Sequence, residues 1–417
     1  MGQQKGIFMR IKDKIFYGWV IVAAALLIFC ITSGVRYSFG VFFKALQGDF
    51  DLTRAATSAV FSAYMVLSTI FSIVSGWAVD KYGPRLVVCL MGFFIGLSLL
   101  ITSQTNSFWQ LFLSYSLPLA MGTGGTIPVV ISTVSRWFEK KRGIALAITT
   151  SGSGLGILIV APFAAYLIDN FNWRISYIVI GLIAGLLVIS MALLLRRDPG
   201  ESGALPDGVK SDIARTRLTD VGENFQPAGL SLLQATRTSN FWLLLSIWLL
   251  LGLCISLVIT HVVPYATDTG VSIIEASTIL SVVSGFMILS RLLVGRVSDT
   301  IGRKIPAIVC AVLGAGALVW LTLSHNLWMF YTFAIVWGFY QGGLGIASLA
   351  MASDFFRGPN LGKIIGVLDA GFLTGSAIGS FLGGFIFDVT GSYFIAFAIG
   401  ATAVLLTGLF VSLTSRR

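Results

Sequence analysis

Two arginines stand inside long apolar stretches of this sequence, where a positive charge is expensive to place. Arg36 lies eight residues before Lys44, and Arg291 lies eight residues before Asp299. At about 1.5 Å of rise per helical residue, each arginine is roughly 12 Å from the nearer polar end of its stretch. An unpaired arginine at that depth costs a few kcal/mol or more, so it must face a wet cavity or a counter-charge. Asp369 is the one well-buried carboxylate available, and one acid cannot neutralise two arginines. The sequence therefore predicts that at least one guanidinium group binds an anion.

Four uncharged polar side chains occupy similar stretches and are candidates for lining the same cavity. Tyr37 adjoins Arg36, and Tyr340 and Gln341 precede two glycines. Tyr115 is the fourth candidate, for which a packing role is the alternative. These side chains would shape the space around a small anion.

Two residues are candidates for carrying a proton. His261 precedes Pro264 near the end of an apolar stretch, and histidine titrates near neutrality. Its alternative role is structural, as a donor to a carbonyl that the proline leaves free. Asp369 is the competing proton carrier, unless Arg36 or Arg291 holds it ionised.

The composition indicates which elements position these residues. Of the 417 residues, 56% are hydrophobic and 11% are charged, whereas a soluble domain has about 25% charged residues. A membrane-spanning helix needs about 20 apolar residues, so there is room for about a dozen. This balance excludes a cytosolic enzyme, a secreted disulfide scaffold and a disordered chain.

The apolar runs predict an all-α membrane protein with twelve transmembrane helices. The first six are expected near 17–44, 55–79, 86–104, 108–135, 143–168 and 174–195, and the second six near 240–267, 274–298, 305–323, 328–353, 363–387 and 393–414. We therefore expect an N-terminal six-helix bundle over residues 1–195, a cytoplasmic linker over 196–239 and a C-terminal six-helix bundle over 240–417.

The basic residues predict the orientation of the chain. Its net charge is +10, but the lysines and arginines are scattered over short loops, which does not indicate nucleic-acid binding. With both termini in the cytoplasm, 23 of the 28 fall on the cytoplasmic side, and only Lys44, Arg54 and Arg174 fall outside. Cytoplasmic loops are enriched in lysine and arginine. We therefore expect a multi-pass protein with cytoplasmic termini.

The two halves repeat a loop motif at an offset of 219 residues, Gly76–Arg85 after the second span and Gly295–Lys304 after the eighth. Glycine allows a tight turn between helices, and aspartate can pair with cations or cap a helix. Parallel six-span repeats with a site between them are a transporter architecture. The candidate gating residues of the two loops are Gly76, Asp80, Gly83, Arg85, Gly295, Asp299, Gly302 and Arg303.

These loops resemble the signature of the major facilitator superfamily, and the repeat extends the resemblance over nearly the whole chain. Within that superfamily, three stretches are similar to the bacterial monocarboxylate transporter and oxalate/formate antiporter group: Gly34–Phe42, Arg136–Gly143 and Thr260–Tyr265. The resemblance implies that Arg291 is a ligand of the substrate carboxylate. It also implies that the two loops form part of a cytoplasmic latch.

The expected function is secondary active transport of small organic anions, with proton-coupled symport of lactate- or pyruvate-like monocarboxylates. An exchanger of oxalate/formate or dicarboxylate type and a nitrate-type porter are the alternatives. No nucleotide-binding loop, nucleophile–histidine set or metal-ligand cluster is present, since His261 and His325 are the only histidines. We therefore expect no enzyme activity, cofactor or metal. The expected setting is a bacterial cytoplasmic membrane, with a lipid bilayer, protons and a small anion as partners, and a functional monomer.

Overall fold

The computed structural model describes residues 16–138, 141–199, 231–356 and 361–415. Within these ranges, twelve helices are long and apolar enough to cross a membrane, which confirms the expected number of spans. The expectations for the basic N-terminal residues, most of the linker (200–230) and Arg416–Arg417 lie outside the described residues. The described chain contains helices and no strands.

The observed helices begin and end within a few residues of the expected spans. The N-terminal half contains α2 (Gly18–Tyr37), α3 (Phe39–Asp49), α4 (Arg54–Tyr82), α5 (Pro84–Thr102), α6 (Phe108–Thr123), α7 (Thr126–Trp137), α8 (Arg142–Asn170) and α9 (Trp173–Leu194). The C-terminal half contains α11 (Leu232–Ala235), α12 (Ser239–Asp268), α13 (Ile273–Ile301), α14 (Lys304–Thr322), α15 (Leu327–Phe355), α16 (Leu361–Thr390) and α17 (Phe394–Leu413).

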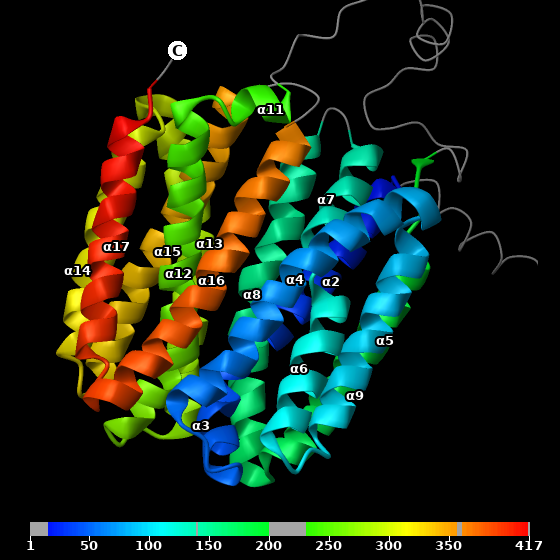
Figure 1. Cartoon of the computed structure of the whole chain (residues 1–417). Helices are drawn as coiled ribbons and strands as arrows, with labels where there is room; N and C mark the ends of the chain where they lie inside the picture. Colours follow the sequence, from blue (N-terminus) through cyan, green and yellow to red (C-terminus); the bar gives the residue numbers. More distant parts are fainter. Residues whose placement is uncertain (1–15, 139–140, 200–230, 357–360, 416–417) are drawn as a thin grey trace, which may run out of the picture.

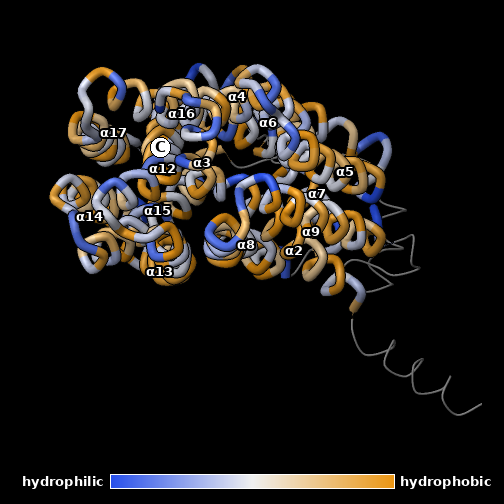
Figure 2. Tube along the Cα trace, turned by 90° about the horizontal axis from the view of Figure 1, so that it is seen from below, coloured by the Kyte–Doolittle hydropathy of each residue, from blue (hydrophilic) through white to orange (hydrophobic). Residues whose placement is uncertain are grey.

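The two halves lie side by side with their helices running between two ends (Figure 1). We call the end at which α2 begins and α17 finishes the terminal end, at the top of Figure 1, and the opposite end the distal end. Viewed from the distal end, α3 of the first half lies next to α12 of the second (Figure 2). The backbones touch there, because a Cβ at Gly40 would collide with the Ile259 carbonyl.

Spans one and four are each divided into two helices. Span one is interrupted at Ser38, directly after Arg36 and Tyr37. Span four is interrupted at Gly124–Gly125, directly after Thr123. Discontinuous membrane helices supply free backbone groups to binding sites in transporters. Both interruptions lie beside Arg36, since Arg36 donates to the Thr123 carbonyl.

Glycines allow close contact between neighbouring helices. Gly375 and Gly379 of α16 face the carbonyls of Leu249 and Leu253 in α12, where a Cβ would not fit. Small residues bring membrane helices together in this way. Gly375 and Gly379 of α16 therefore have a packing role.

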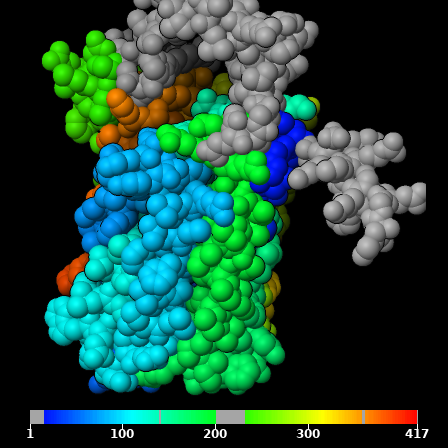
Figure 3. Space-filling view, turned by 90° about the vertical axis from the view of Figure 1, so that its right-hand side faces the viewer, coloured from blue at the N-terminus to red at the C-terminus, as the bar shows by residue number. Residues whose placement is uncertain are grey.

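Large apolar side chains cover the outside of the bundle. Ile73 of α4 is 72% exposed and Leu186 of α9 is 64% exposed. Figure 3 shows the face formed by the N-terminal half, coloured blue to green. Such a surface suits the hydrocarbon of a bilayer rather than water.

Candidate functional site

A central cavity of about 280 Å³ lies between the two halves. This volume is just below the range of about 300–1,000 Å³ typical of pockets for drug-sized ligands. Arg36 and Tyr37 line it from α2, and Arg291, Gln341 and Asp369 line it from α13, α15 and α16. The structure thus brings both candidate arginines and the candidate carboxylate to one space suited to a small ligand.

Arg36 is buried, with 9% of its surface exposed. Its Nε donates to the Tyr64 hydroxyl at 2.9 Å, and its Nη2 donates to the Thr123 carbonyl at 3.2 Å. Arg36 and Asp369 form no ion pair, although both line the cavity. The positive charge of Arg36 is therefore held by neutral groups of the N-terminal half.

Arg291 has weaker partners. Its Nη1 lies 3.3 Å from both the Thr150 carbonyl and the Ser153 hydroxyl, and its Nη2 lies 3.7 Å from the Met287 sulfur. It forms no ion pair with any carboxylate of the described chain. Because these contacts are long and neutral, Arg291 retains most of its capacity to bind an anion.

Asp369 and Gln341 are two further polar residues of the cavity lining. Asp369 makes no hydrogen bond or ion pair with any other described residue. Gln341 is 8% exposed, and its Oε1 atom has no partner within the described chain. With Arg36, Arg291 and Asp369 all ionised, the cavity carries one net positive charge.

Tyr115 and Tyr340 do not line this cavity. Tyr115 packs between Phe39 and Tyr64, with ring centroids 5.2 and 5.9 Å away. Tyr340 packs against Trp337 at 4.7 Å and is fully buried. The structure therefore places both tyrosines in the aromatic core, outside the lining of this cavity.

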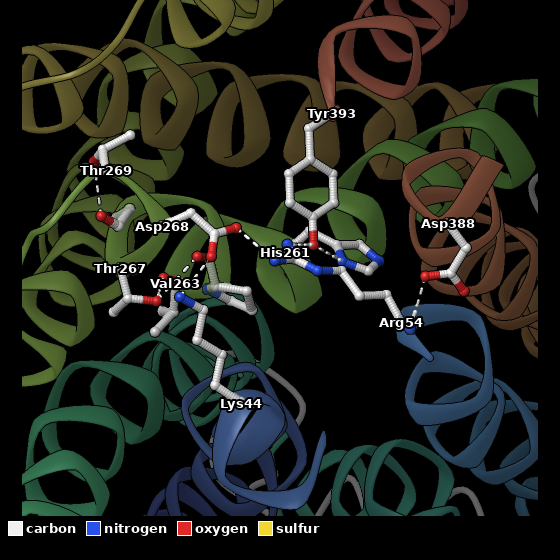
Figure 4. Close-up of polar contacts among 11 residues, drawn as sticks. Lys44, Arg54, His261, Val263, Thr267, Asp268, Thr269, Asp388 and Tyr393 are labelled. Atoms are coloured by element: carbon white, nitrogen blue, oxygen red, sulfur yellow. Dashed lines mark hydrogen bonds and ion pairs between the residues drawn. The ribbon is translucent and has the colours of Figure 1, made fainter. Parts of the chain in front are cut away.

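At the distal end, a polar network crosses between the halves (Figure 4). We call it the distal network; it consists of Lys44, Arg54, His261, Asp268, Asp388 and Tyr393. Asp268 of α12 accepts from Lys44 and from Arg54, each at 2.6 Å. Asp388 of α16 accepts from the backbone N–H groups of Arg54 and Ala55, at 2.9 and 2.7 Å. The C-terminal half therefore binds both the side chain of Arg54 and the backbone N–H groups at the start of α4.

His261 belongs to the distal network rather than to the cavity. It is fully buried, and its Nε2 donates to the Ser380 carbonyl at 2.8 Å. In the neutral ring, Nδ1 accepts from the Tyr393 hydroxyl at 3.1 Å, and that hydroxyl accepts from Arg54 at 2.7 Å. Both ring nitrogens are therefore engaged, and neither bonds a carbonyl of α12 beside Pro264.

The roles of Arg54, Asp268, Asp388 and Tyr393 were not predicted from the sequence. Part of this network could have been predicted from the few basic residues that the sequence places at the distal end. Lys44 and Arg54 bind Asp268, and Arg174 binds Asp49 at 2.6 Å. The three basic residues expected on the outer side of the membrane are thus all paired with carboxylates.

At the terminal end, the two repeated loops form ion pairs within their own halves. Asp80 binds Arg136 at 2.7 Å, and Arg303 binds both Asp299 and Asp354. Partial burial lowers the pKa of Arg303, but Asp299 and Asp354 raise it by more, so that it lies above its ordinary value.

The remaining loop residues are placed as follows. Gly83 and Gly302 have φ of 82° and 89°, the left-handed region that favours glycine. Gly76 and Gly295 lie within the last turns of α4 and α13, and Arg85 lies in the first turn of α5. All five belong to the two helix–loop–helix turns at the terminal end.

The chain is similar in sequence to known transporters. The profile of the Major Facilitator Superfamily matches residues 25–294 and 256–417. Over 419 residues, the chain is 27% identical to monocarboxylate transporter 13 of Bos taurus, covering 95% of this chain and 89% of that protein. It is also 27% identical over 301 residues to the oxalate:formate antiporter of Oxalobacter formigenes, covering 72% and 68%.

Solved structures share the fold. A D-xylose–proton symporter superposes with a TM-score of 0.75 at 14% identity, covering 95% of this chain and 97% of that one. A bacterial homologue of the lysosomal transporter Spinster, in an inward-facing conformation, gives a TM-score of 0.71 at 16% identity, with 95% of each chain covered. The chain therefore belongs to the major facilitator superfamily and is a twelve-span membrane transporter rather than an enzyme.

Proposed function

We propose that this transporter carries small organic monoanions, with monocarboxylates of lactate or pyruvate type as its substrates. The names of its relatives include monocarboxylate transporters and an oxalate:formate antiporter. The observation that carries the proposal is Arg291, a cation inside the membrane bundle that faces the cavity with only long contacts to neutral groups. A guanidinium group binds a carboxylate through two parallel hydrogen bonds.

The charges of the cavity favour one anion at a time. Arg36 and Arg291 supply two positive charges, and ionised Asp369 offsets one of them. A monoanion bound while Asp369 is ionised neutralises the cavity, whereas the same anion bound beside protonated Asp369 leaves one net positive charge.

Proton symport follows if Asp369 takes a proton when the anion binds. The anion and ionised Asp369 repel each other, so binding of the anion favours protonation of Asp369, and protonation of Asp369 favours binding of the anion. The empty cavity with ionised Asp369 and the loaded cavity with protonated Asp369 carry the same net charge. We therefore assign the proton to Asp369 and place His261 in the gate that closes the distal end.

The orientation supports alternating access. We place the terminal end in the cytoplasm, because the sequence assigns 23 of the 28 lysines and arginines to the loops and termini expected on that side. The distal network then closes the outer end while the loop ion pairs stay within each half. This arrangement corresponds to an inward-facing state, in which the two six-helix bundles move as units joined by the linker over 196–239. The setting we propose is a bacterial cytoplasmic membrane, and one chain contains the complete pathway.

Uptake into proteoliposomes tests the proposal. Labelled lactate, pyruvate, acetate, formate, oxalate and nitrate are offered with and without an inward pH gradient. We expect a pH gradient to drive accumulation of the monocarboxylates. Accumulation of oxalate against internal formate, without dependence on pH, would instead indicate an exchanger. Nitrate uptake without carboxylate uptake would overturn the proposal.

A further inference from the structure

Ser33 differs from the other serines and threonines of the central cavity. Five of the six that line it donate their hydroxyl hydrogen to a backbone carbonyl three or four residues earlier in the chain: Thr32, Thr126, Thr150, Ser153 and Ser348. Ser33 is the sixth. It is 7% exposed, and its hydroxyl makes no hydrogen bond with any other described residue. Its hydrogen is therefore available to a ligand in the cavity.

The backbone around Ser33 explains why its hydroxyl is left free. In a helix, a serine can donate to the carbonyls three and four residues earlier, which for Ser33 are those of Cys30 and Phe29. The Phe29 carbonyl already accepts from the Thr32 hydroxyl at 3.3 Å. The Cys30 carbonyl is covered by α8, because a Cβ at Gly156 would come within 2.0 Å of its oxygen. Both local acceptors are therefore crowded.

Along the bundle, Ser33 lies about one helical turn from the place where Arg291 contacts α8. Gly152 of α8 packs against α2 at Cys30, where a Cβ would lie 3.2 Å from the backbone nitrogen. The next residue, Ser153, has its hydroxyl 3.3 Å from Arg291 Nη1. From Cys30 to Ser33 the helix rises by about 4.5 Å toward the distal end. Ser33 is therefore slightly nearer the distal end than the Arg291 guanidinium group, in the same cavity.

A carboxylate bound to Arg291 brings the rest of a small acid within reach of Ser33. A carboxylate oxygen lies about 2.8 Å from a guanidinium nitrogen that it binds. In lactate and pyruvate, the carbon next to the carboxylate, C2, carries a further oxygen. An acid that extends toward the distal end places this oxygen within hydrogen-bonding distance of a side chain about one turn away. A serine hydroxyl can donate to an oxo group, and it can donate to or accept from a hydroxyl group.

We propose that the Ser33 hydroxyl binds the oxygen on C2 of the substrate and thereby makes the transporter selective for 2-hydroxy and 2-oxo monocarboxylates over unsubstituted ones such as propionate. The inference rests on the proposed function, because the carboxylate must bind Arg291. Propionate would leave the Ser33 hydroxyl buried beside a methylene group without a partner. A site that hydrogen-bonds a substrate oxygen rejects an analogue without that oxygen for this reason.

Ser33→Ala tests the inference through a ratio of affinities. In proteoliposomes, unlabelled lactate, pyruvate and propionate compete with labelled lactate in counterflow, and their inhibition constants are measured. The wild type should bind lactate and pyruvate more tightly than propionate. Ser33→Ala removes one hydrogen bond between neutral groups, so this preference should fall by about fivefold. The inhibition constant of propionate should change little. If the variant transports too slowly, ligand-induced shifts of its unfolding temperature in detergent give the same ratio.

Ser68→Ala is the matched control. Ser68 of α4 is fully buried outside the cavity lining, and its hydroxyl has no partner in the described chain. Its removal should leave the preference for lactate over propionate unchanged. An equal loss of preference in Ser33→Ala and Ser68→Ala would mean a general disturbance of the bundle and would overturn the inference.

Two further results separate the inference from the proposed function. If the wild type transports lactate but binds propionate equally well, or if Ser33→Ala keeps the wild-type ratio, Ser33 does not bind the C2 oxygen and the proposed function stands without it. If the wild type transports none of the three acids, the proposed function fails and the inference fails with it.

Discussion

Arg36 and Asp369 line one cavity from opposite halves without forming an ion pair. Arg36 instead donates to Tyr64 and Thr123. If the two charges do not hold each other, removing both should not rescue transport. We expect the double variant Arg36→Gln, Asp369→Asn to transport lactate no better than the weaker of the two single variants. A double variant with clearly restored uptake would mean that the pair is structural.

Arg291 should be essential for substrate binding. We expect Arg291→Ala to abolish uptake, because the carboxylate loses its cation. Arg291→Lys keeps the charge but loses the planar fork, so transport should fall by about tenfold or more, the equivalent of one charge-assisted hydrogen bond. Expression and folding are checked by size-exclusion chromatography. Wild-type uptake by a well-expressed alanine variant would remove Arg291 from the site.

Substitution of Asp369 and substitution of His261 should affect proton-coupled transport differently. Asp369→Asn is expected to lose accumulation driven by a pH gradient while retaining counterflow, since counterflow needs no net proton movement. His261→Gln should retain pH-driven accumulation and change only the rate, because His261 lies in the distal network. If His261→Gln loses pH-driven accumulation but keeps counterflow, His261 rather than Asp369 carries the coupled proton.

Arg54 should hold the distal end closed. Arg54→Gln removes hydrogen bonds to Asp268 and Tyr393, at 2.6 and 2.7 Å, that cross between the halves. Loss of one charge-assisted bond is worth about 1.5–3 kcal/mol, so the distal-open population should rise at least tenfold. The readout is labelling of Ser62→Cys, in a background without native cysteines, by an impermeant maleimide. Ser62 is partly buried, and it donates to the Ala377 carbonyl across the halves at 2.8 Å, a contact that opening of the distal end would break.

Arg174→Gln is the control for the gate. Arg174 binds Asp49 at the same distance, 2.6 Å, but both residues belong to the N-terminal half. Its loss should leave Ser62→Cys labelling unchanged. Equal labelling in the two variants would indicate general loosening of the distal end.

The repeated turns should require glycine for their backbone conformation. Gly302 adopts φ 89° and ψ 163°, a region almost restricted to glycine. Gly302→Ala should therefore cost about 1–3 kcal/mol of stability. Gly143→Ala, in a helix start with open space around it, should be neutral or slightly stabilising. Thermal unfolding in detergent compares the two, and equal midpoints would contradict the assignment.

The sequence by itself determined the twelve spans, the repeat and the depth of the two arginines. Each depends on local properties: an apolar run of about 20 residues forms one helix in lipid, and a charge within it needs a wet cavity. Tertiary structure alone decided which polar groups meet. Tyr64 reaches Arg36 across 28 positions and His261 reaches Tyr393 across 132, because packed helices bring distant residues together at angles that sequence spacing does not encode. For the same reason Tyr115 and Tyr340, which match the cavity candidates in type and depth, face the core. The side of a helix that faces the cavity is set by its neighbours, and in a nearly uniform apolar helix the sequence carries little record of that side.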